Sequence, residues 1–76
     1  MSNTQALIKA KLLRSQLGMA DKTMKSLRLT AQPLIDTYFA KDTWEVRVVW
    51  ANFYLDTVIG YLDEVIEILN RPDEAA

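Results

Sequence analysis

The fold is decided by the C-terminal half of the chain, where residues 43–70 read TWEVRVVWANFYLDTVIGYLDEVIEILN. Apolar side chains recur in this segment at alternating steps of four and three, at Trp44, Val48, Ala51, Leu55, Val58, Leu62, Val65 and Leu69. Heptad spacing of this kind is typical of a long helix that packs against another in coiled-coil fashion, so we predict a helix over about residues 43–70. Asp42 with Glu45 provides a capping-box-like start. Asn70 and Pro72 provide the stop.

A second heptad seam runs through the N-terminal part of the chain, at Ala6, Ala10, Leu13, Leu17, Ala20, Met24, Leu27 and Ala31. It predicts a first helix over about residues 4–30, capped by a polar side chain among residues 2–4. Gly18 weakens a helix interior, but the seam keeps its phase across it, so we expect no break there. Pro33 should end or kink this helix, because proline lacks an N–H donor and clashes with the preceding turn.

The segment that joins the two helices keeps helical spacing of apolar residues, which predicts a short connector helix over about residues 33–40. Long helices with a short connector should lie antiparallel. If facing residue numbers sum to 75, small side chains meet large ones at several layers and Lys11 lies opposite Glu64. A register slipped by one heptad also pairs small with large, so both registers stay open, with the first favoured.

Length and composition limit the class of protein. The chain has 76 residues, of which half are hydrophobic, too many for a disordered chain, and its apolar runs are far shorter than a bilayer span. We expect a single helical domain over residues 1–72 and a disordered tail over 73–76. The start of the chain carries no export signal, so we expect a soluble, cytoplasmic protein that does not enter a membrane.

The residue inventory argues against catalysis. The chain contains no His and no Cys, which removes the commonest neutral-pH acid/base group, the thiol nucleophile and most metal ligands. Polar residues of the second helix form what we expect to be a solvated strip: Glu45, Asn52, Asp56, Asp63, Glu67 and Asn70. We therefore predict no enzyme, metal site, cofactor or small-molecule substrate.

The second helix has more apolar surface than a hairpin needs. A surplus stripe lies about a third of a turn from the seam, at Trp50, Tyr54, Tyr61 and Ile68. A smaller patch on the first helix lies roughly opposite its seam, at Ile8, Leu12 and Met19. The connector could cover this surplus in a three-helix monomer, or another protein could cover it. We favour a third arrangement, in which two copies form a four-helix bundle.

Charge is divided between the two halves of the chain. Residues 1–38 hold six basic and two acidic side chains, and residues 39–76 hold three basic and eight acidic ones. Four basic residues fall on one side of the first helix and form a basic edge: Lys11, Arg14, Lys22 and Lys25. We expect this edge to pair with the acidic helix, with an acidic protein or a phosphate backbone as the alternative. A pI near 5.2 and the absence of aromatic residues along the edge argue against nucleic acid.

These observations predict a binding protein without a catalytic step. We expect a homodimeric adaptor or inhibitor that masks the surface of a partner protein. Two alternatives remain open: a nucleic-acid-associated regulator that uses the basic first helix, and a structural component of a larger assembly.

Overall fold

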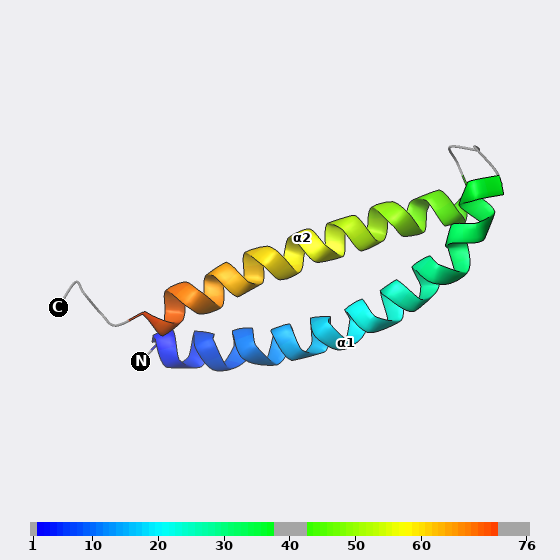
Figure 1. The fold of residues 1–76 in the computed structure, drawn as a ribbon. Coiled ribbons are helices and arrows are strands. Elements are labelled where there is room, and N and C mark those ends of the chain that lie inside the picture. Colours follow the sequence, from blue (N-terminus) through cyan, green and yellow to red (C-terminus); the bar gives the residue numbers. More distant parts are fainter. Residues whose placement is uncertain (1, 38–42, 72–76) are drawn as a thin grey trace.

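The protein is a hairpin of two long helices. The computed structural model describes residues 2–37 and 43–71, in which α1 spans Ser2–Thr37 and α2 spans Trp44–Asn70. The helices lie side by side and antiparallel, so the start of α1 and the end of α2 meet at one end of the molecule (Figure 1). The described part of the chain contains no strand, which confirms the all-α hairpin.

The first helix is longer than its sequence pattern predicts. It continues through Gly18, as expected, but it also includes Pro33 and ends only at Thr37. The predicted end near residue 30 is therefore wrong, and residues 33–37 of the predicted connector helix belong to α1, while residues 38–40 lie outside the described part. Pro33 lies within the last turns of α1, and this end of the helix bends towards α2 (Figure 1).

The ends of the helices differ in part from the predicted caps. Residues 3 and 4 lie inside α1. At the start of α2, Thr43 has extended backbone angles, and its hydroxyl accepts a hydrogen bond from the Val46 N–H at 3.4 Å. This Thr43 cap takes the place expected for Asp42, which lies outside the described residues. The predicted stop at Asn70 is confirmed, because the next residue, Arg71, is extended.

The residues between the two helices form an inner seam that differs from the predicted pair of seams. Its members on α1 are Leu7, Ala10, Arg14, Leu17, Asp21, Met24, Arg28 and Ala31. Its members on α2 are Glu45, Val48, Asn52, Leu55, Ile59, Leu62, Ile66 and Leu69. All of them except Arg28 are buried or half-buried. Each row again alternates steps of three and four, but every second predicted residue is replaced by its C-terminal neighbour.

The inner seam carries polar contacts that the sequence does not suggest. Asn52, expected on a solvated strip, is only 1% exposed, and its Oδ1 accepts a hydrogen bond of 2.8 Å from the Arg28 guanidinium. Its Nδ2 has no partner among the described residues, and the same holds for the buried Oε2 of Glu45. The solvated-strip prediction is therefore wrong for Asn52, whose burial a charge-assisted hydrogen bond compensates, and for half-buried Glu45.

The register differs from the predicted one by a few residues. Contacts across the hairpin join residues whose numbers sum to 77 for Arg14 with Asp63 and to 80 for Arg28 with Asn52. The expected Lys11–Glu64 ion pair is not formed within the described part of the chain. These sums also exclude the register slipped by one heptad, in which facing residues would sum to 68.

The hairpin is only one helix thick. Its Cα atoms extend over 58 × 20 × 14 Å, and its two helices form a single layer. Among the described residues, the buried side chains are Ala10, Ala31, Val48 and Asn52. Folded domains normally bury their apolar surfaces between at least two layers, whereas the two described helices form one layer.

Candidate protein-binding surface

Half of each predicted seam lies on the surface of the hairpin instead of between the helices. We call this surface the apolar face. On α1 it comprises Ala6, Leu13, Ala20 and Leu27, all of which are exposed. On α2 it comprises Trp44, Ala51, Val58 and Val65, with Tyr54, Tyr61 and Ile68 beside them. The large residues of this surface are 43–66% exposed, so they make few contacts within the hairpin.

The two halves of the apolar face point to the same side of the hairpin. On each helix, its seam residues directly precede an inner-seam position, as Leu13 precedes Arg14 and Ala51 precedes Asn52. In antiparallel helices, equal offsets from the contact line turn to the same side. The residues that follow inner-seam positions turn to the other side, where Lys25 binds Asp56 at 3.1 Å.

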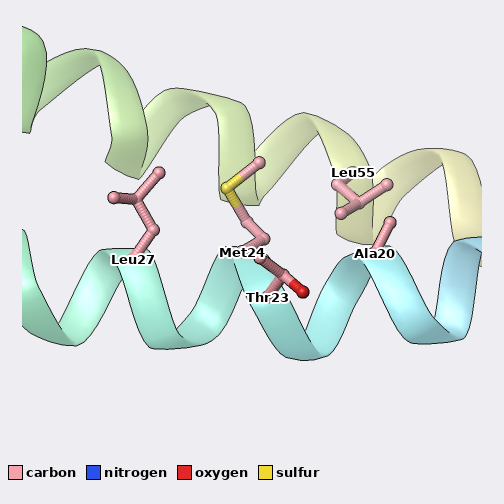
Figure 2. Close-up of a pocket in the computed structure, with 5 residues that line it drawn as sticks. All are labelled: Ala20, Thr23, Met24, Leu27 and Leu55. Atoms are coloured by element: carbon pink, nitrogen blue, oxygen red, sulfur yellow. The ribbon is translucent and has the colours of Figure 1, made fainter.

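One open groove lies on the apolar face, and a second lies at its edge, beside Trp50. The first, of about 530 Å³, is lined by Ala20, Thr23, Met24, Leu27 and Leu55. Figure 2 shows Ala20, Met24, Leu27 and Leu55 between the two helices. The second, of about 450 Å³, is lined by Arg47, Trp50, Ala51 and Tyr54 of α2 alone. The first groove is almost wholly apolar, so it offers packing and no polar chemistry.

The structure divides the predicted interface residues between separate surfaces. Three of the predicted residues on α2 belong to the apolar face: Tyr54, Tyr61 and Ile68, each about 60% exposed. Trp50 is 55% exposed and lies further round α2, on its outer side. The predicted residues of α1, which are Ile8, Leu12 and Met19, lie on the side of α1 away from the apolar face. They are exposed, but they do not join the α2 stripe in one surface.

Eight residues of this surface were predicted to lie in the hairpin core: Ala6, Leu13, Ala20, Leu27, Trp44, Ala51, Val58 and Val65. Their heptad spacing was the right signal, but it does not reveal which neighbour a helix packs against. Phe53 was missed entirely. It is 56% exposed, and its ring lies 6.2 Å from that of Trp50 and 5.8 Å from that of Tyr54, in edge-on geometry.

The predicted basic edge is partly used within the hairpin. The Arg14 guanidinium contacts the Asp63 carboxylate at 2.7 Å. Lys25 bridges Asp21 at 2.8 Å and Asp56 at 3.1 Å. Hydrogen bonds to Asp21 and then to Asp56 raise the pKa of Lys25. Two of the four basic residues thus pair with acidic side chains, and the other two, Lys11 and Lys22, are exposed.

The described residues offer little for chemistry. No group of three or more His, Cys, Asp or Glu side chains within residues 2–37 and 43–71 is placed to hold a metal ion. In the same part of the chain, neither helix has an apolar stretch long enough to cross a bilayer. What the arrangement does offer is a large apolar face backed by a charged one, which is typical of a surface that binds another protein.

Comparisons with known proteins give this surface no counterpart: no family model matches the chain, and no curated protein or solved structure matches it.

Proposed function

We propose that this chain is a non-catalytic protein–protein interaction module that acts as a homodimer, in which two hairpins join their apolar faces to form a four-helix bundle. Such a module works by occupancy: as an adaptor it holds a partner, and as an inhibitor it masks the partner's surface. The inference rests first on the direction in which the two heptad seams point.

One observation carries this proposal. On each helix, the predicted seam is rotated from the inner seam by about 50° around the helix axis, on a 3.5-residue period. Both rotations turn to the same side of the hairpin, so the two predicted seams converge on one axis parallel to the helices. In a four-helix bundle of square cross-section, each helix directs its apolar seam at the central axis, about 45° away from the line to its neighbour. The seams of a single hairpin thus have the orientation that a bundle of two hairpins requires.

Burial supports the same arrangement. Val58 is 50% exposed, Val65 44% and Leu27 43%, so about half of each side chain stays in water in a single hairpin. Complete burial of such a side chain stabilises by about 1.5–3 kcal/mol. A three-helix monomer is a poor alternative, because only six residues separate Thr37 from Trp44 and the hairpin is 58 Å long.

The charged side supports protein binding over nucleic-acid binding. Arg14 and Lys25 already contact carboxylates of α2, so a phosphate backbone would have to displace those partners. Two ion pairs between the basic helix and the acidic helix thus join the antiparallel helices.

Light scattering across protein concentration tests the proposal. We expect a mass of twice 8.7 kDa at high micromolar concentration. Val65→Lys, which places a charge in the apolar face, should give the mass of one chain. The matched variant Glu64→Lys changes the neighbouring residue on the outer side and should stay dimeric. A monomeric wild-type chain at high micromolar concentration would contradict the proposal.

A further inference from the structure

A second exposed apolar surface lies on the outer side of α2. Trp50 and Phe53 are 55% and 56% exposed, and their rings meet edge-on at 6.2 Å. The Tyr54 ring stacks on Trp50, also at 6.2 Å, and so connects this aromatic cluster to the rim of the apolar face. Exposed aromatic clusters are the commonest anchors of protein interfaces, since rigid rings bury much area at little entropic cost.

The proposed bundle leaves this cluster uncovered. With the apolar seam of α2 directed at the bundle axis, Phe53 points about 180° and Trp50 about 130° away from that axis on a 3.5-residue period. A second copy on the apolar face therefore covers neither side chain. The cluster needs a different occupant.

Acidic residues continue the same side of α2. Glu64 and Glu67 follow Trp50 and Phe53 by two heptads each, so they lie on the same outer side, nearer the end of the helix. Both are exposed, and Glu64 has no ion pair among the described residues. Glu67 contacts Arg71 at 3.2 Å, a fully solvated pair that a competing cation can replace at little cost.

A glycine, which has no side chain, separates the aromatic residues from the acidic ones on this side of α2. Gly60 lies midway between Phe53 and Glu67, and a Cβ added to it would meet no described atom within 4 Å. Packing within the hairpin therefore gives no reason for glycine at this helix-interior position, where alanine is more stable. A partner that approaches the α2 backbone closely supplies such a reason.

We infer that the outer side of α2 binds a helix of a partner protein that is apolar at one end and basic at the other. Apolar side chains of that helix cover Trp50 and Phe53, its backbone passes close to Gly60, and its Lys or Arg residues contact Glu64 and Glu67. The distance from Trp50 to Glu67 along α2 is about 25 Å, so the partner helix needs about five turns. This inference rests on the proposed function, because the bundle is what leaves this side free.

A pair of model peptides tests the inference. Two labelled 18-residue helical peptides, each with Leu in one half and with either Lys or Glu in the other half, are titrated with the full chain and followed by fluorescence anisotropy. We expect the Lys peptide to bind at least tenfold more tightly than the Glu peptide. Phe53→Ala should weaken the Lys peptide about tenfold, whereas Leu12→Ala, an equally exposed apolar truncation on α1, should leave its affinity unchanged. The double variant Glu64→Lys with Glu67→Lys should reverse the preference between the peptides.

Several results would overturn the inference: no binding of the Lys peptide, equal binding of both peptides, or equal losses in Phe53→Ala and Leu12→Ala. Dissociation of the dimer by the peptide would also overturn it, because that places the peptide on the apolar face. Light scattering on the same samples separates the two proposals. Dimeric mass without peptide binding refutes only this inference, and monomeric mass with Phe53-dependent binding refutes only the homodimer.

Discussion

Replacing Val58 by Ala should weaken association of two hairpins without unfolding either one. Val58 is 50% exposed on the apolar face, so half of its side chain is left for a second copy to bury. The truncation removes two carbon groups, worth about 1.6 kcal/mol at full burial. Half of that is about 0.8 kcal/mol per chain and, since both chains change, about 1.6 kcal/mol per dimer. The dissociation constant should therefore rise about fifteenfold.

Sedimentation equilibrium measures this constant directly. The matched control is Thr57→Ala, because Thr57 is exposed on the outer side of α2 and its hydroxyl bonds only to the helix backbone, at the Phe53 carbonyl. Thr57→Ala should dissociate as the wild-type chain does. If Val58→Ala and Thr57→Ala both stay within twofold of wild type, Val58 does not lie in a dimer interface and the reasoning fails.

Four further predictions concern the hairpin itself. Leu62→Ala, in the inner seam, should lower the free energy of unfolding by about 2–5 kcal/mol in urea denaturation, and a loss below about 0.5 kcal/mol would remove Leu62 from the core. Asn52→Leu should leave stability within about 1 kcal/mol or raise it, because the lost hydrogen bond from exposed Arg28 is offset by removal of an unpartnered buried Nδ2; a loss above about 2 kcal/mol would contradict this. Gly60→Ala should raise the thermal midpoint through about 0.5–1 kcal/mol of helix stabilisation, since its Cβ meets open space, and a lower midpoint would show a contact there. The raised pKa of Lys25 favours its charged form in the fold, so this contribution is present below its ordinary pKa and disappears as pH rises through the raised value; Lys25→Gln should lack that alkaline loss when denaturation is compared across pH.

The sequence predicts the two helices well because their heptads are long and regular. Regular spacing identifies a helix and its apolar positions from one chain alone. It does not identify the neighbour, because Ala10, Leu17 and Met24 belong both to the predicted seam and to the inner seam. Whether Leu13 or Arg14 lies with them at the helix contact depends on whether α1 packs against α2 alone or against a further helix as well.

Polar residues of the inner seam account for much of the remaining difference between the predicted and the observed contacts of the two helices. Arg28 and Asn52 are both polar, as surface residues usually are. Nothing in the identity of either residue predicts that Asn52 is buried. Their hydrogen bond exists only after the helices have paired, so a reading of each helix separately assigns Asn52 to solvent. The same holds for Arg14, whose partner Asp63 lies on the other helix.

Pro33 shows how local rules depend on position. Proline inside a long helix normally breaks it, and this rule predicts an end near residue 30. α1 instead continues through Pro33 to Thr37, so this helix tolerates the loss of the single N–H donor that proline lacks. The start of α2 differs by one residue from the predicted one, because the Thr43 hydroxyl accepts the capping hydrogen bond.

Contacts between two copies can be observed without any substitution. In a mixture of isotope-labelled and unlabelled chains, an isotope-filtered nuclear Overhauser experiment detects only protons of one chain that lie near protons of another. Homodimerisation through the apolar face predicts signals between chains from the methyl groups of Leu13, Leu27, Val58 and Val65. Their absence at a concentration where the chain is dimeric, or signals only from Ile8 and Leu12 on the opposite side of α1, would contradict it.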